Sequence, residues 1–133
     1  MSESGFQFSN PVLIKLSFEL NKGFDPANSQ PEKVSMSSRV SISSTEDNTA
    51  IVTLDIGIEP NGENYPYVIS AAMSSEFRRS SEIGDEKLIE MLLHKNAPAL
   101  LLGYLRPYIA FITAAGPAQQ VNIPFMDFTK KDT

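Results

Sequence analysis

The sequence contains no cysteine and only one histidine, and it has fewer basic than acidic residues. Without cysteine there is no disulfide framework, no thiol nucleophile and no thiolate metal site, and nothing argues for an oxidising compartment. The 11 basic and 16 acidic residues give a net charge of -5, which opposes binding to a phosphate backbone. We therefore expect a cytoplasmic protein that does not bind nucleic acid.

Long apolar runs are scarce as well. Residues 1–5 lack the basic start and apolar stretch of a secretory signal, and no window approaches the roughly 18 apolar residues of a membrane span. We expect no membrane insertion. The 133 residues, of which 41% are hydrophobic and 20% charged, have the composition of a folded protein, and we expect a single domain over residues 1–133.

Residue types that carry catalysis are sparse and scattered. His94 lies at the end of a predicted helix, no cluster of His, Asp and Glu has metal-ligand spacing, and no glycine-rich loop follows a strand. The acidic pairs 46–47 and 85–86 stand at element ends, where turn formation and capping explain them. We expect no enzyme, no catalytic residue, no metal site and no cofactor.

Four segments alternate between apolar and polar residues with the period of a β-strand. They span residues 6–20, 34–43, 50–58 and 65–77, and turn-forming residues such as 44–48 separate them. Because most of the turns are short, we predict a four-stranded antiparallel meander sheet with one apolar face.

The apolar face of this sheet needs a cover, and the only candidate is the segment after Gly84. Its residues 85–94 have helical spacing, Pro98 then interrupts the helix, and a second helix runs to Gly116. Pro107 predicts a bend within this second helix. The predicted fold is α+β, with one long broken helix on the apolar face of the sheet.

The second helix is apolar on both sides. Leu102 and Phe111 face away from the stripe of Tyr104 and Tyr108, and one sheet could not bury both sides. We therefore predict a homo-oligomer. The predicted interface residues are Leu100, Leu101, Tyr104, Leu105, Tyr108, Phe111 and Ile112.

An apolar helix that starts at Pro98 and ends at Gly116, followed by an extended segment, resembles the SecB family of protein-export chaperones. The matching residues are Pro98, Leu101, Tyr104, Arg106, Ile109, Gly116, Asn122, Pro124 and Phe128. The resemblance implies an ATP-independent holdase that binds unfolded or pre-export polypeptides through apolar grooves. It also implies a dimer of dimers, with the long helices packed between two sheets, whereas the residues alone leave dimer and tetramer open.

Two departures from the family weaken the case for contact with its motor protein, SecA. Lys15 and residues 69–71 stand where the family presents acidic residues on the polar sheet face, and the sequence ends at Thr133 without the family's C-terminal helix. Two alternatives stay open. One is a dedicated SecB-like chaperone of a toxin–antitoxin or phage-related system, and the other is a non-chaperone oligomeric adaptor.

A client-binding surface is predicted from apolar positions near the sheet ends and from the extended segment 121–128. Each apolar side chain of a client that such a surface buries contributes about 1.5–3 kcal/mol without any sequence code. The predicted client-binding residues are Val40, Ile42, Leu54, Tyr65, Tyr67, Phe125 and Met126.

Overall fold

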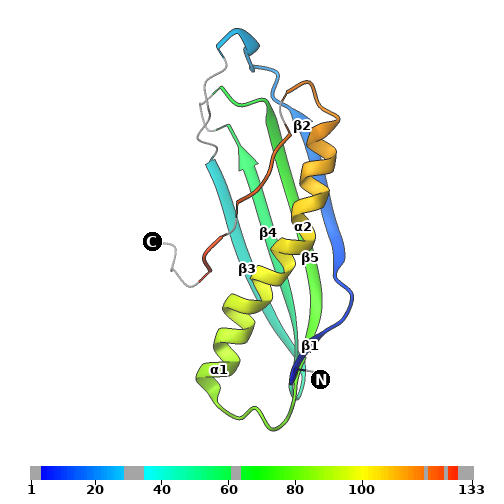
Figure 1. Cartoon of the computed structure of the whole chain (residues 1–133), viewed down its shortest axis with the longest axis vertical. Coiled ribbons are helices and arrows are strands. Elements are labelled where there is room, and N and C mark those ends of the chain that lie inside the picture. The colour runs from blue at the N-terminus through cyan, green and yellow to red at the C-terminus, as the bar shows by residue number, and fades with distance from the viewer. Residues whose placement is uncertain (1–3, 29–34, 61–63, 119, 125, 129–133) are drawn as a thin grey trace.

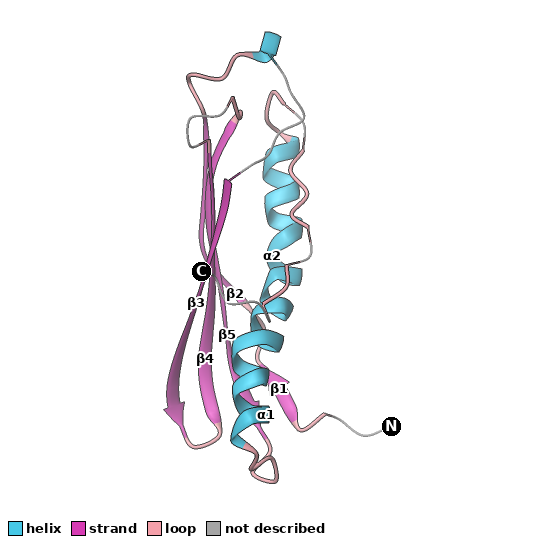
Figure 2. Cartoon of the chain, turned by 90° about the vertical axis from the view of Figure 1, so that its left-hand side faces the viewer, coloured by secondary structure: helices cyan, strands magenta, loops and turns pink. Residues whose placement is uncertain are grey.

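The computed structural model describes residues 4–28, 35–60, 64–118, 120–124 and 126–128. Within them, the strands are β1 (Phe6–Phe8), β2 (Val12–Leu20), β3 (Ser35–Glu46), β4 (Thr49–Glu59) and β5 (Tyr67–Arg79). The helical segments are η1 (Pro26–Asn28), α1 (Glu86–Met91), η2 (Leu92–Asn96) and α2 (Ala97–Ala114). Figures 1 and 2 show two layers, with the long helix lying across one face of an antiparallel sheet. The predicted α+β fold class is confirmed.

The sheet has β5 at its centre. On one side β5 pairs with β4, which pairs with β3, as the predicted meander requires. On its other side β5 pairs with both β1 and β2. The first predicted strand therefore does not lie beside the second, because the chain crosses from one edge of the sheet to the other between β2 and β3. Alternation of apolar residues identifies a strand but not its partner.

The predicted strand over residues 6–20 is divided into β1 and β2 by an irregular stretch that includes Pro11, which has no N–H to donate to a ladder. The Ser75 hydroxyl, which is buried, donates to the carbonyl of Ser9 and holds this break in place. A second irregularity adds Ile14 between the paired residues Leu13 and Lys15. Each extra residue reverses which side chains face the core.

This double reversal corrects the predicted alternation. Val12 and Ile14 were expected on the apolar face with the other even-numbered residues of 6–20, but they are 61% and 59% exposed. Leu13 packs against the core instead. Beyond the second irregularity the original phase returns, and Leu16 and Phe18 face the core again.

The helical layer begins at Asp85, whose carboxylate accepts a hydrogen bond from the Lys87 N–H at 3.0 Å. The predicted interruption at Pro98 takes the form of a π-helical turn, η2, in which the Ala97 N–H donates to the Leu92 carbonyl five residues earlier. The chain therefore stays helical from 86 to 114. Pro107 lies inside α2 on its exposed side, so the carbonyl that loses its donor belongs to the exposed residue Gly103.

The helix crosses the sheet on a diagonal, from the β3 edge at α1 to the β2 side at the end of α2 (Figure 1). Its sheet-facing residues, including Leu101, Leu105 and Ile109, are fully buried against β4 and β5. Leu102 also faces the sheet, whereas Tyr104 and Tyr108 are about half exposed. This corrects the predicted orientation, because the tyrosines lie on the outer side of α2 together with Phe111.

By length and composition, residues Glu86–Ala114 are apolar enough to cross a membrane, with a mean hydropathy of 1.3. This corrects the expectation that no window of the sequence comes close to that composition. In this fold 39% of the window is buried, as in a helix that covers a core. The absence of membrane insertion stays a prediction.

Candidate functional site

Beyond α2 the chain turns back across the same face of the sheet (Figure 1). The buried Tyr67 hydroxyl donates to the Thr113 carbonyl at 3.3 Å and accepts from the Ala118 N–H at 3.1 Å. The Thr113 hydroxyl, which is also buried, accepts from the Val121 N–H at 2.8 Å. Gly116 lies so close to the tyrosine that a Cβ there would be 2.6 Å from the phenol oxygen. A buried tyrosine and a buried threonine therefore fix this turn.

The segment after the turn is anchored by side chains rather than by strand pairing. Ile123 is 2% exposed, and its carbonyl accepts a hydrogen bond from Nε of Arg106 at 2.7 Å. The described residues in 120–128 form no ladder with the sheet. A cavity of about 300 Å³ lies beneath the segment. Its lining residues are Met36, Ile58, Tyr65, Val121, Asn122, Ile123 and Pro124.

A second cavity, of about 270 Å³, lies at the opposite end of the sheet, beneath α1 and η2. Apolar side chains form most of it, among them Phe6, Phe77 and Ile89, and the β3–β4 turn contributes Glu46 and Asp47. Asn48 adopts a positive φ of 66° in this turn, a conformation that asparagine tolerates better than most residues. Arg79 of β5 lines the same cavity, so its wall is mainly apolar and carries charges of both signs.

Strand β3 connects the two cavities. Met36 lines the first, Ser44 lines the second, and Val40 and Ile42 between them are half-buried and pack against the core. The nine residues from Met36 to Ser44 span about 26 Å, because the strand rises about 3.3 Å per residue. We call this stretch, Met36 to Ser44 with the cavity at each end, the β3 strip.

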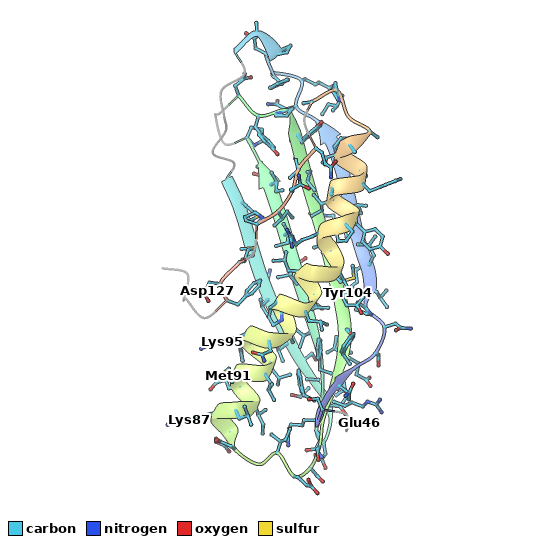
Figure 3. The ribbon with its side chains drawn as sticks, in the orientation of Figure 1. Glu46, Lys87, Met91, Lys95, Tyr104 and Asp127 are labelled. Carbon is cyan, nitrogen blue, oxygen red and sulfur yellow. The ribbon has the colours of Figure 1, made fainter. Side chains whose placement is uncertain are left out.

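The opposite side of the molecule carries exposed apolar side chains. On α2, Tyr104, Tyr108 and Phe111 are 45%, 48% and 83% exposed, and they follow helical spacing along one side. Val12 and Ile14 on β2 are exposed as well, but Val12 pairs with Ser74, which contacts Thr53 on the face of the sheet away from α2. The Tyr104 ring makes an edge contact with Phe8, with centroids 6.0 Å apart. Figure 3 shows Tyr104 directed toward the β2 side of the helix. We call the three exposed aromatic residues of α2, Tyr104, Tyr108 and Phe111, the β2-side patch.

The fold leaves some of the predicted client-binding residues half-buried and buries others completely. Val40, Ile42 and Met126 are half-buried near the β3 edge, and Tyr65 lines the cavity there. Leu54 and Tyr67 are fully buried, so a client could reach them only if α2 left the sheet. Phe125 lies outside the described residues. Their role in binding stays a prediction.

The predicted interface residues are divided in the same way. Tyr104, Tyr108 and Phe111 are exposed, and Leu100 and Ile112 are half-buried. Leu101 and Leu105 are fully buried against the chain's own sheet, where another copy could reach them only by displacing the helix. Contact with another copy stays a prediction for this set.

Several residues of these surfaces were not singled out from the sequence. Ile123 and Met36 lie in apolar alternation, which could have marked them, but Thr113 looks like an ordinary helix residue. Arg106 was noted only as one of the residues that resemble the SecB family. Val12 and Ile14 were placed on the wrong face because the break between β1 and β2 shifts the alternation before them, and the irregularity at Ile14 restores it only beyond them. Among the described residues, no group of three or more His, Cys, Asp or Glu side chains could hold a metal ion.

The sequence matches no protein family and no curated protein. Comparison with solved structures does find similar folds. One is the Mycobacterium tuberculosis SecB-like chaperone Rv1957, solved in complex with a ChAD peptide from the Rv1956 HigA1 antitoxin. It has a TM-score of 0.70 and 12% identity, and the match covers 92% of this chain and 91% of the chaperone.

A second similar structure is a protein of unknown function from Streptococcus agalactiae. Its TM-score is 0.61 with 14% identity, and the match covers 93% of this chain and 100% of that protein. The chain described here therefore has a SecB-like fold, as its C-terminal residues suggested.

Proposed function

We propose that this protein is an ATP-independent holdase that binds unfolded polypeptides along the β3 strip. The observation that carries the proposal is the likeness in fold to a chaperone that was solved with a bound peptide. The strip adds half-buried apolar side chains and a cavity at each end, which suit an extended client. Several apolar contacts, each of about 1.5–3 kcal/mol, would offset the ordering of a client segment.

The holdase works without catalysis in this proposal. By binding the unfolded state in preference to the folded state, it lowers the concentration of free unfolded chains through mass action. The absence of cysteine and the negative net charge favour the cytosol as its location.

A dedicated chaperone is the second candidate, because the similar Mycobacterium tuberculosis protein was solved with an antitoxin peptide. Such a protein would protect one client rather than many. The residues on the polar face of the sheet argue against export through SecA. Where SecB proteins present acidic residues on the polar sheet face, β2 carries Lys15 and β5 carries Ser70, and the neighbouring Ala71 is buried in the core.

Suppression of aggregation tests the proposal. The protein is mixed at a stoichiometric ratio with several unrelated, chemically denatured proteins, and light scattering follows their aggregation. A general holdase suppresses aggregation of all of them, and a dedicated one suppresses that of a single client. If no client is affected at any ratio, the protein is an adaptor without chaperone activity and the proposal is wrong.

We further propose that copies of the chain associate through the β2-side patch. Exposed side chains such as Phe111, at 83%, are unusual on a soluble monomer unless a partner covers them. Replacing Tyr104, Tyr108 and Phe111 by serine should lower the solution mass measured by light scattering to that of one chain. A matched variant with serine at Leu88 and Met91, which are exposed on α1, should keep the mass of the unchanged protein. A monomeric unchanged protein would contradict this association.

A further inference from the structure

The helix that covers the sheet is packed unevenly along its length. In α2, Leu101, Leu105 and Ile109 are among the buried residues, whereas none of the six described residues of α1 is buried. The main contacts of α2 are with β4 and β5, and those of α1 are with η2. Buried apolar contacts are what hold a segment closed in the native state. We therefore expect α1 to leave the sheet at a lower free energy than α2.

The junction between α1 and α2 is a weak point of the helix. In the π-helical turn η2, the Ala97 N–H donates to the Leu92 carbonyl five residues earlier. Pro98 comes next and has no N–H, so no α-helical donor reaches the carbonyl of the exposed residue His94. Helices bend at prolines and at π-helical turns. The junction therefore suits a hinge on which α1 moves as one unit.

The cavity of about 270 Å³ lies beneath this hinged part of the helix. Its floor contains two stacked rings, Phe6 and Phe77, whose centroids are 5.3 Å apart with an interplanar angle of 18°. The Phe8 ring lies 6.0 Å from that of Phe77 and extends the aromatic cluster. The inner side of α1 and η2 forms the roof, with the half-buried residues Ile89, Leu92 and Leu93. The cavity thus has an aromatic floor and an aliphatic roof.

The charged groups of the cavity have both signs. Glu46 and Asp47 line it at the exposed β3–β4 turn, and Arg79 lines it from β5. Nη1 of Arg79 donates to the Ile83 carbonyl at 2.8 Å. A bound anion would lie near two carboxylates, and a bound cation would lie near a guanidinium group, so neither charge is favoured. An uncharged ligand with an aromatic body therefore suits this lining.

We propose that this cavity binds an uncharged aromatic small molecule and that α1 closes over the bound molecule as a hinged lid. The aromatic ring packs against Phe6 and Phe77, and the inner side of α1 covers its other face. An apolar cavity of about 150 Å³ is enough for benzene, so the volume here leaves room for a second ring. This inference goes beyond the proposed function and does not depend on it.

The test uses the full chain and indole as the probe. Because the chain contains no tryptophan, indole fluorescence reports the ligand alone when it is excited beyond the absorption of tyrosine. We expect a blue shift on binding and a dissociation constant of about 0.1–1 mM, as for other very small ligands. Tryptamine and indole-3-acetate add a positive and a negative charge to the same ring, and neither should bind more tightly than indole.

An aromatic side chain of a polypeptide is the alternative occupant, and N-acetyltryptophanamide tests it. This compound is uncharged and has the same ring, but it also carries two amide groups. If the cavity is a small-molecule site, the amides find no room beneath the lid without losing hydrogen bonds to water, and binding should be at least about fivefold weaker than that of indole. Binding tighter than that of indole would identify a side-chain site and overturn the proposal.

Variants that fill the cavity locate the probe. Ala50 is a buried lining residue, so Ala50→Leu fills the space from the sheet, and Leu93→Phe fills it from the lid. Each should weaken indole binding at least about tenfold. Leu93 is half-buried, so the second variant carries the test if the first does not fold. Val121→Phe fills the other cavity in the same way and should change the affinity by less than about twofold.

Hydrogen exchange tests the lid. In the free protein, we expect faster exchange in α1 than in α2. Indole at about ten times its dissociation constant should slow exchange in α1 and η2 by up to about tenfold and leave β2 unchanged.

Two proline variants test the hinge. Pro98→Ala restores the missing donor and should slow exchange in α1 of the free protein. Pro107→Ala, on the exposed side of α2, is the matched control and should not change exchange in α1.

Four further results would overturn the proposal. They are no binding of indole at millimolar concentration, binding that survives both cavity-filling variants, loss of binding with Val121→Phe alone, and unchanged exchange in α1 when indole is bound. No denatured protein enters these measurements. The ligand site and the holdase function therefore fail separately.

Discussion

The two long sides of this molecule present different chemical groups. On the β2 side, the backbone edge is protected by Pro11 and by the irregularity at Ile14, while side chains such as Val12 and Phe111 are exposed. On the β3 side, the apolar side chains are half-buried, and among the described residues the backbone of β3 pairs with β4 alone.

This difference separates two kinds of recognition. Exposed aromatic and aliphatic side chains in a fixed arrangement suit one partner of matching shape, such as another copy of the chain. An open backbone edge pairs with any extended segment, because every residue carries the same N–H and C=O groups. Under the proposed function, one side would therefore suit a single partner and the other would suit many clients.

The largest expected effect on stability comes from removing a buried contact between α2 and the sheet. Leu105→Ala deletes a fully buried side chain between α2 and the sheet, and should lower the free energy of unfolding by about 2–5 kcal/mol. Phe111→Ala on the outer side of the same helix should change it by less than about 0.5 kcal/mol. Chemical denaturation measures both. Equal losses in the free energy of unfolding would mean that the inner and outer sides of α2 do not differ in burial.

A smaller loss of stability is expected for the segment that follows α2 and returns to the β3 side. Thr113→Val keeps the shape of a buried side chain but removes the acceptor of the Val121 N–H, which should cost about 1–3 kcal/mol. Hydrogen exchange should become faster at residues 118–124 and stay unchanged in β2. Thr53→Val, which breaks a partly buried hydroxyl contact to Ser74 on the other face of the sheet, is the matched control. Faster exchange in β2 after Thr113→Val would show that the two sides are coupled.

The smallest expected effect on stability concerns the pairing of β3 with β4. A Cβ on Gly57 would lie 2.8 Å from the Ser37 hydroxyl, so Gly57→Ala should strain the β3–β4 pair. Adding Ser37→Ala removes the contact and should restore stability, with a coupling energy of about 0.5 kcal/mol in a double-mutant cycle. Additive changes would mean that the hydroxyl moves aside at no cost.

Much of the fold could be predicted from the sequence because its signals are local. The alternation in β4 and β5 and the helical spacing after Asp85 identified the elements and the apolar face that they share. The predicted order of the strands was wrong at one position, because no local feature of the sequence shows that β2 pairs with β5 rather than with β3. The insertion at Ile14 was missed for the same reason.

The candidate site was predicted less completely than the fold. Apolar positions such as Val40, Ile42 and Met126 do lie near the β3 edge, but Leu54 and Tyr67 have the same sequence character and are fully buried. Alternation gives the face of a sheet to which a side chain points. Whether a helix then covers that side chain depends on the diagonal along which the helix crosses.

The sequence by itself determined which residues form strands and helix, since hydrophobic period and capping act within a few residues of one another. Only the tertiary structure decided which strands became edges, which edge stayed open and which side of α2 faced outward. Those outcomes depend on pairing between segments far apart in the chain, such as β2 with β5. They also depend on how a single helix divides one apolar face between buried and accessible positions.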